Sequence, residues 1–423
     1  MGPEGAPLRL EIGRPHEGLR VVRQPPPAGA ASFSATYFAP AGWGFDPAGV
    51  EGTARLLNQV MASATQRLDR VQLARRLDRS GATLSHAISP EAAEFTIWGP
   101  ADEWRPLLGL LAEVVRLPRY DPEDIARVRR QLLERQLREL TQPASRANSE
   151  LLKLVYPPAH PYRSTGLGTR RSVERLDRAR LERFHREHYT ADGAAVVVTS
   201  AASLSSVERS IRGVFSFPSK SKPAHLRFPR LRARSPERRV LDLPGQSQVE
   251  IRLGGPSIPQ DAPAYTAAYL GNEVLGGRPL QSRLFQRIRA RNGLAYHASS
   301  DLDTMRWGGI WTAQAGTGPD RWRRVVPMLE AEVGRLRREL VPQRELSATR
   351  RSTVGAMQLA LESTAEAHGL AVDVAYHELP ADYLLRWPAR LRSVRPVDVR
   401  AAARLAFDQN HSATIVAGPV GPV

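Results

Sequence analysis

Histidine is the first residue type to consider for chemistry, because the chain has ten histidines and no cysteine. The absence of cysteine excludes disulfide bonds, Cys-ligated zinc or iron–sulfur sites and thiol nucleophiles. Only His185 and His188 lie within five residues of each other, in the run Phe184-His-Arg-Glu-His-Tyr189. Histidines three residues apart on a helix can share a metal ion, but the same run is typical of a helix end with surface histidines. We expect the second arrangement.

Phosphate-binding and serine-hydrolase motifs are absent from the sequence. The pair Gly276-Gly277 is followed by no G-x-x-x-x-G-K-[ST] pattern and belongs to no G-x-G-x-x-G pattern after a strand. We interpret this pair as a turn that ends a helix. No Ser–His–Asp arrangement stands out.

The chain has 423 residues and is strongly basic. Lys and Arg number 60 against 43 Asp and Glu, which gives a formal net charge of +17 and a pI near 10.9. Such a charge suggests nucleic acid as a partner, but the arginines are spread along helices and no recognised binding module is present. We therefore expect no specific nucleic-acid partner.

Membrane and export signals are also missing. No apolar run approaches the roughly 20 residues that span a bilayer, and Met1–Arg23 lacks the apolar core of a signal peptide. Either the chain is cytoplasmic or a signal was removed before this numbering begins. We expect a cytoplasmic protein that does not associate with membranes.

An internal repeat organises the chain. A strand, a turn and an amphipathic helix occur around Trp104 and again around Trp322, and a helix end followed by a β-branched strand occurs at Tyr189 and again at Phe407. Both pairs are 218 residues apart, so one register relates the two halves. This pattern predicts an α+β fold with two homologous domains, each a mainly antiparallel sheet packed against helices.

The boundaries follow from composition. Residues 217–240 are rich in proline, serine and positive charge, which is typical of a solvated linker. We therefore expect a first domain over residues 1–216, the linker over 217–240 and a second domain over 241–423.

The segment Leu275–Tyr296 resembles the second-domain signature of the pitrilysin/insulinase-type zinc peptidases, the family that includes mitochondrial processing peptidase. It contains the Gly-Gly turn, then Ser-Arg-Leu-Phe, then Gly-Leu-Ala-Tyr. Further resemblance lies in 148–162, in Gly168–Tyr189 and in Ile415–Gly418, so it extends over nearly the whole chain. It implies a half-length bacterial member of this family.

The family's catalytic centre is an HxxEH helix with a distal Glu, and the resemblance assigns its positions here. Arg55 stands for the first His, Asn58 for the Glu, Gln59 for the second His and Gln136 for the distal Glu. Histidines at i and i+4 share one helix face and can both bind zinc, while the Glu polarises the bound water.

All four positions are degenerate. A guanidinium keeps its proton near pH 7, and amides are poor zinc ligands that cannot act as a general base. Glu134 lies two residues from Gln136 and makes that alignment the least certain. We therefore expect no catalytic residue, metal or cofactor in this chain.

A second pair of residues matches the family better. In active relatives an Arg and a Tyr seven residues later hydrogen-bond the substrate peptide, and Arg289 and Tyr296 stand at that spacing. Outside the family context, Arg289 could equally be a solvated helix charge and Tyr296 a core aromatic. A guanidinium and a phenol suit a peptide carbonyl or a C-terminal carboxylate, so we expect substrate binding here.

The resemblance implies a non-catalytic subunit. Some family members pair a chain that carries HxxEH with a chain that carries the Arg/Tyr pair, and we expect this chain to be the second type. Its partner would be a homologous HxxEH subunit that holds zinc, and the heterodimer would cleave peptides. The alternatives are an inactive scaffold subunit and, more weakly, a basic nucleic-acid-associated protein.

Overall fold

The computed structural model describes residues 9–217, 226–231 and 236–421. These residues form two compact units, each with its own sheet and core. The first unit comprises 1–136, 165–227 and 357–386, and the second comprises 137–164, 228–356 and 387–423. The compact units differ from the contiguous domains expected from the sequence in two segments, because 137–164 belongs with the second sheet and 357–386 with the first.

The linker expected over 217–240 coincides only in part with irregular structure. Segments 218–225 and 232–235 lie outside the described residues, and 226–231 is irregular. The final part is not a linker, since Glu237–Asp242 forms strand β7 and pairs in parallel with β11. The β-branched and apolar pair Val240-Leu241 favours this strand over the charges that precede it.

The first unit contains a six-stranded sheet with the order β1-β2-β6-β3-β5-β4. All neighbours are antiparallel except β2 and β6. The strands are β1 (Glu11–His16), β2 (Leu19–Gln24), β3 (Ser32–Ala39), β4 (Thr83–Ile88), β5 (Ala93–Pro100) and β6 (Ala195–Thr199).

The second unit contains a five-stranded sheet with the order β7-β11-β8-β10-β9. Its strands are β7 (Glu237–Asp242), β8 (Val249–Pro256), β9 (Ala295–Met305), β10 (Gly308–Thr317) and β11 (Ala413–Gly418). The single parallel pair, β7 with β11, corresponds to β2 with β6, and the remaining strands follow in the same order. The expected α+β fold of two homologous, mainly antiparallel halves is confirmed.

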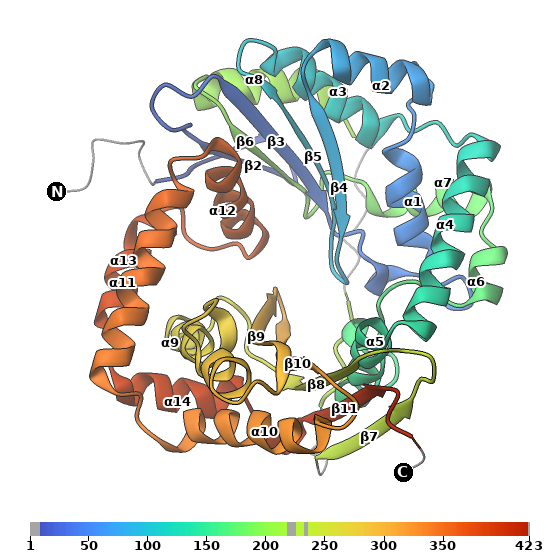
Figure 1. Cartoon of the computed structure of the whole chain (residues 1–423). Coiled ribbons are helices and arrows are strands. Elements are labelled where there is room, and N and C mark those ends of the chain that lie inside the picture. The colour runs from blue at the N-terminus through green and yellow to red at the C-terminus, as the bar shows by residue number, and fades with distance from the viewer. Residues whose placement is uncertain (1–8, 218–225, 232–235, 422–423) are drawn as a thin grey trace. The chain divides into compact units, whose positions relative to one another are not determined.

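Helices of the first unit pack on the apolar face of its sheet (Figure 1). Phe33, Ala35 and Tyr37 alternate along β3 toward this face and are completely buried with α1 and α3 in one core. The helices are α1 (Thr53–Met61), α2 (Arg70–Arg79), α3 (Trp104–Arg116), α4 (Pro122–Thr141), α6 (Arg170–Glu174), α7 (Arg178–His188), α8 (Leu204–Val214) and α12 (Thr364–Tyr376), and α4 ends beyond the unit.

Helix α12 contacts β2, β3 and β6 on the opposite face of this sheet. That face is polar, and the His368 imidazole bridges the hydroxyls of Thr36 and Thr199 at 2.8 Å each. Burial lowers the pKa of His368 to about 3, so the ring is neutral at physiological pH. A helix from the C-terminal half of the chain thus covers the sheet of the N-terminal half.

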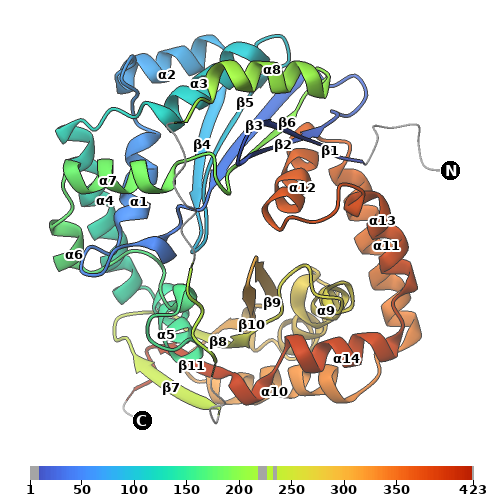
Figure 2. The ribbon, with the colours of Figure 1, turned by 180° about the vertical axis from the view of Figure 1, so that it is seen from behind.

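The second unit shows the reciprocal arrangement (Figure 2). Helix α5 comes from the N-terminal half and contacts β8 and β11, where Leu151 packs with Ile415. The opposite face carries the main core with α9, α10 and α14. The elements are α5 (Pro143–Val155), α9 (Tyr265–Asn272), the π-helical turns η3 (Glu273–Gly277) and η4 (Phe285–Ala290), α10 (Trp322–Arg338), α11 (Gln343–Ala360), α13 (Tyr383–Ser393) and α14 (Pro396–Ala406), where α11 ends in the first unit and α13 begins there.

Three short 3₁₀ turns complete the secondary structure: η1 (Trp43–Phe45), η2 (Pro161–Arg163) and η5 (Gln409–His411). Among the described residues, no helix has the length and apolar character needed to cross a bilayer.

Candidate functional site

Helix α1 carries Arg55, Asn58 and Gln59, three of the four degenerate positions. The side chain of Asp46, in the loop before the helix, binds its first turn. Asp46 accepts the backbone N–H of Gly52 through Oδ2 and of Ala54 through Oδ1, each at 2.7 Å. Two of the free N–H groups of the first turn are thereby satisfied. Burial raises the pKa of Asp46 to about 7, against the lowering effect of these hydrogen bonds.

Asn58 is completely enclosed, with 1% of its surface exposed. Its Nδ2 donates to the carbonyl oxygens of Ala87 at 3.2 Å and Glu94 at 3.5 Å, which lie on the paired strands β4 and β5. Its Oδ1 lies 2.7 Å from Nδ1 of His86. Because Nδ2 is the donor to the strands, Oδ1 accepts and His86 donates. The amide at the former Glu position therefore ties α1 to the β4–β5 hairpin.

Arg55 and Gln136 reach the same loop. Nη2 of Arg55 donates to the carbonyl of Thr165 at 2.6 Å, and Nε2 of Gln136 donates to the carbonyl of Leu167 at 2.8 Å. The Arg55 guanidinium also lies 4.6 Å from the centre of the Trp43 ring, a cation–π distance. The positions expected to face a metal ion are thus brought together, but they bind backbone carbonyls of the protein itself.

Gln59 has a partner that the sequence did not indicate. Its Nε2 donates to Oε1 of Gln131 on α4 at 2.5 Å. Glu134, the alternative to Gln136, is exposed to solvent, whereas Gln136 is half-buried and points to the loop beside Arg55. Neither Gln131 nor His86 could be found from spacing, because they reach α1 from elements 72 and 28 residues away.

This constellation does not fit zinc. It offers one guanidinium and three amides, and each of these side chains is bonded to the surrounding protein. No group of three or more His, Cys, Asp or Glu side chains that could hold a metal ion occurs anywhere in the described part of the chain. The four side chains as bonded here offer neither a zinc ligand nor a general base.

His185 and His188 lie half-buried in the last turn of α7. His185 Nε2 lies 2.7 Å from the carbonyl of Val115, and the His188 ring packs against Phe184 with centroids 4.2 Å apart. Burial lowers the pKa of both histidines to about 4. They belong to no metal-binding group of the described residues; they lie at the helix end, as the sequence suggested, but are half-buried and not fully exposed.

Arg289 lies in the second unit, at the end of the π-helical turn η4. Its guanidinium stands 5.1 Å from the centre of the Phe285 ring, and the side chain is exposed. A left-handed Gly293, at φ 59°, reverses the chain and donates to the carbonyl of Arg289 at 2.9 Å. Among the described residues, the Arg289 side chain has no hydrogen bond and no ion pair. π-Helical turns inside helices occur frequently at functional sites.

Tyr296 lies on β9, just after this reversal, with 61% of its surface exposed. The ladder between β9 and β10 pairs His297 with Gly316 and Ala295 with Thr317, so Tyr296 is the extra residue of a β-bulge. Bulges redirect side chains and are over-represented next to active sites. The expected helix-to-strand setting of the Arg/Tyr pair is therefore present, and both side chains are available to a ligand.

The Gly276-Gly277 pair ends the helical run of α9 and η3, as the sequence predicted. Neither glycine has a positive φ, so a left-handed conformation is not the reason for glycine here. Gly276 instead lies in the π-helical turn η3, directly against β9, where a Cβ would stand 2.2 Å from the backbone nitrogen of Ser300. Glycine is required because two backbones approach closely, and this approach fixes β9 beneath the Arg/Tyr turn.

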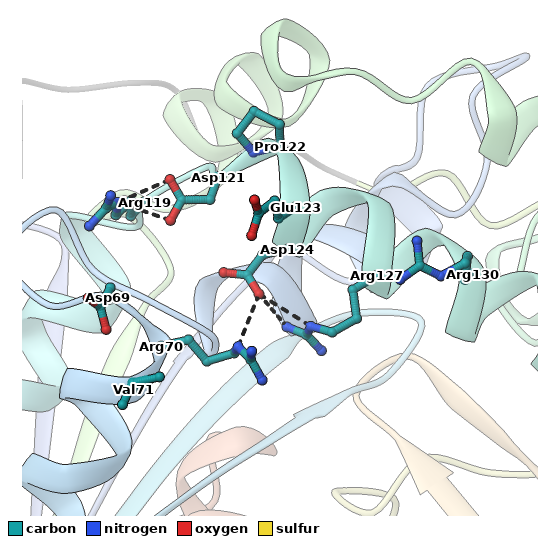
Figure 3. Close-up of a pocket in the computed structure, with 10 residues that line it drawn as sticks. All are labelled: Asp69, Arg70, Val71, Arg119, Asp121, Pro122, Glu123, Asp124, Arg127 and Arg130. Atoms are coloured by element: carbon teal, nitrogen blue, oxygen red, sulfur yellow. Dashed lines mark hydrogen bonds and ion pairs between the residues drawn. The ribbon is translucent and has the colours of Figure 1, made fainter.

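A pocket of about 650 Å³ in the first unit lies at the starts of α2 and α4 (Figure 3). Its charges largely neutralise one another, since Asp124 pairs with Arg127 at 2.7 Å and with Arg70 at 3.8 Å, and Arg119 pairs with Asp121 at 3.0 Å. Ligand sites are usually apolar with a few converging polar groups. This pocket has neither feature and includes none of the candidate site residues.

Two family models match the chain. Residues 28–156 match the model described as "Insulinase (Peptidase family M16)", and residues 175–353 match the model described as "Peptidase M16 inactive domain". The first match includes the degenerate positions, and the second includes Arg289 and Tyr296.

Curated relatives are similar over much of the chain. An uncharacterized zinc protease of Mycobacterium tuberculosis is 24% identical over 410 residues, which cover 96% of this chain and 92% of the relative. An uncharacterized zinc protease of Streptomyces coelicolor is 27% identical over 267 residues, which cover 60% of this chain and 56% of the relative.

Two solved structures share the fold. The peptidase M16 inactive domain from Pseudomonas fluorescens aligns with a TM-score of 0.89 and 23% identity, covering 97% of this chain and 98% of that chain. A protease from Helicobacter pylori aligns with a TM-score of 0.90 and 18% identity, covering 97% of this chain and 99% of that chain.

Proposed function

The chain belongs to the insulinase-type M16 peptidase family, and from this membership we propose that it is the non-catalytic subunit of a heterodimeric zinc metallopeptidase. A homologous subunit with an intact HxxEH helix supplies the zinc ion, the general base and the water. This chain closes the chamber and positions the peptide through Arg289 and Tyr296. The complex works in the cytoplasm.

One observation carries the proposal. The four positions that would bind and activate zinc are bonded into the first unit, whereas Arg289 and Tyr296 are exposed and make no hydrogen bond within the described residues. Exposed arginine and tyrosine side chains pay no structural penalty for binding a ligand, since no internal hydrogen bond is lost.

The pair suits an extended peptide. The guanidinium donates to a carbonyl or carboxylate oxygen, and the phenol donates to a second oxygen. Extended peptides also add to exposed sheet edges through their backbone, with side-chain contacts giving selectivity. In the complex, Arg289 and Tyr296 hold the segment of peptide next to the scissile bond, and the partner carries out the hydrolysis.

The test needs the HxxEH homologue from the same genome. Both chains are co-expressed, purified as a complex, and assayed with a quenched-fluorescence peptide library. Arg289→Ala and Tyr296→Phe are each expected to lower kcat/KM of the complex by about 10- to 100-fold, the usual loss for a positioned donor. The chain alone is expected to bind no stoichiometric zinc and to cleave nothing.

A matched control is Arg338→Ala, another exposed arginine of the second unit, which is expected to leave kcat/KM unchanged. Full activity of the Arg289→Ala/Tyr296→Phe complex would instead identify the chain as a scaffold. Failure to co-purify with any HxxEH homologue would contradict the heterodimer.

A further inference from the structure

The net positive charge is concentrated in one unit. Both units contain equal numbers of lysine and arginine, but the second has far fewer acidic residues and accounts for +14 of the formal +17. A surplus of one sign over a compact body raises the local concentration of ligands of opposite sign. The second unit, which carries Arg289 and Tyr296, therefore attracts anions.

Around the Arg/Tyr turn this surplus is not neutralised locally. Arg291 follows Arg289 at the end of η4, is exposed, and has no ion-pair partner among the residues that the structure describes. Arg321 also lies at this turn, because its Nη1 donates to the carbonyl of Gly293 at 3.1 Å. Its own carboxylate neighbour, Asp320, stands at 3.5 Å and is largely exposed.

Two buried acids contact residues of this region, and both already have partners. Glu250 pairs with Arg252 and His297. Glu332 on α10 is 1% exposed and pairs with both Arg287 and Arg335, so it leaves Arg289 and Arg291 uncompensated. The turn thus presents three guanidinium groups beside one exposed phenol, and a guanidinium recognises a carboxylate through two parallel N–H bonds.

We infer that this site selects acidic peptides, namely peptides that place Asp or Glu side chains, or a C-terminal carboxylate, beside Arg289 and Arg291. The inference rests on the proposed peptide-positioning function and names its substrate class. Selection is electrostatic, so it weakens as salt shortens the Debye length to about 10 Å at 0.1 M.

The test uses the full chain and fluorescein-labelled 20-residue peptides of equal length and apolar content. One peptide carries four Glu residues, a second has these changed to Gln, and a third has them changed to Lys. Each is made with a free and with an amidated C-terminus, which separates the two carboxylate sources. Fluorescence anisotropy at 50 mM and 300 mM NaCl gives the Kd values.

The Glu peptide is expected to bind about tenfold more tightly than the Gln peptide at 50 mM salt, and the ratio should fall to about twofold at 300 mM. Arg291→Gln is expected to reduce the preference about threefold, because it weakens binding of the Glu peptide more than binding of the amidated Gln peptide. The control is Arg338→Gln at the other end of α10, roughly 26 Å along the helix from Arg321, beyond the range of these charges. It should leave every Kd unchanged.

The outcomes distinguish a failure of the acidic preference from a failure of the proposed peptide-positioning function. Equal Kd values for the Glu, Gln and Lys peptides, or no binding of the Glu peptide, would overturn the acidic preference. The proposed function would still stand if Arg289→Ala lowered kcat/KM of the complex. An equal loss of preference in Arg291→Gln and Arg338→Gln would show diffuse attraction by the whole unit and would also overturn the site.

Discussion

The α1 site of the first unit and the Arg/Tyr turn of the second unit differ in how their polar side chains are satisfied. In the first, Arg55, Asn58 and Gln136 are bonded to backbone carbonyls. In the second, Arg289 and Tyr296 point into solvent without hydrogen bonds among the described residues. The difference is one of side-chain partners.

The difference separates a structural use of polar residues from a binding use. A buried amide must be paired or it costs the full desolvation penalty, and the pairing of Asn58 makes α1 a packing element of the first unit. An exposed guanidinium has no such requirement and remains available for a ligand. Substitutions should therefore affect stability in the first region and peptide binding in the second.

Asn58→Leu is expected to have the largest effect. It removes the donors to Ala87 and Glu94 and the acceptor of His86, so three hydrogen bonds of a fully buried side chain are lost, each worth about 1 kcal/mol. We expect a loss of about 3 kcal/mol in the unfolding free energy of the first unit. Hydrogen-exchange mass spectrometry in increasing urea, read on peptides of α1 and β4–β5, measures this loss separately from the second unit.

The matched control is Gln59→Leu, which removes one half-exposed hydrogen bond and should cost about 1 kcal/mol. In both variants, kcat/KM of the folded complex should stay within about twofold of the wild type. A large drop in kcat/KM without destabilisation would show that α1 takes part in catalysis. The polar side chains of α1 would then not be purely structural.

Gly276→Ala tests whether the backbone beneath the Arg/Tyr turn is fixed by close packing. A Cβ at this position would lie 2.2 Å from the nitrogen of Ser300, so η3 or β9 must shift. We expect a destabilisation of about 2 to 3 kcal/mol of the second unit. Gly293→Ala is the matched change, because nothing lies within 4 Å of its Cβ position and only the left-handed φ is strained, at about 1 kcal/mol.

Equal losses in these two glycine variants, measured by urea unfolding, would argue against close packing as the reason for Gly276. A binding measurement adds to this comparison. Gly276→Ala should weaken peptide binding as well as stability, because it displaces β9 and with it Tyr296.

Acid should destabilise the first unit through His368. Its folded pKa of about 3 lies below the ordinary value near 6.5, so the unfolded chain takes up the proton first. The stability that the neutral ring confers is complete above pH 6.5 and is lost as the pH falls toward 3, by up to about 1.4 kcal/mol per pH unit. Urea unfolding at pH 7.5, 6.0 and 5.0 should show a shallower decline for His368→Gln than for the wild type. Identical slopes would mean that His368 does not titrate between folded and unfolded states.

Much of the architecture could be predicted from the sequence, because the offset of 218 residues relates Trp104 to Trp322 and Tyr189 to Phe407. Matching strand orders in the two sheets are the structural form of that repeat. What periodicity could not supply is the exchange of α5 and α12 between the halves. An amphipathic pattern indicates that a helix buries one face, but it does not say which sheet receives that face.

The site residues also fall into those that the sequence indicates and those that only the tertiary fold reveals. The degenerate positions and the Arg/Tyr pair are assigned through the resemblance to the family, whose motifs each lie within one or two elements of the chain, and their roles stay predictions. His86 and Gln131 could not be identified, since each meets α1 only through the tertiary fold. The bulge at Tyr296 could not be predicted from the sequence either, because it depends on the register between β9 and β10 and not on residue type.

The smallest expected effect on stability is that of Tyr296→Phe, and it gives the sharpest test of the comparison. The phenol is exposed and has no hydrogen bond within the described structure, so its removal should change the unfolding free energy by less than about 0.5 kcal/mol. The same substitution should still weaken the Glu peptide's binding to the chain by about 5- to 10-fold, since one donor to the ligand is lost. Urea unfolding and anisotropy on the same preparation measure both. A stability loss near 2 kcal/mol would show that the hydroxyl has an internal partner, and Tyr296 would then belong with Asn58 as a structural residue.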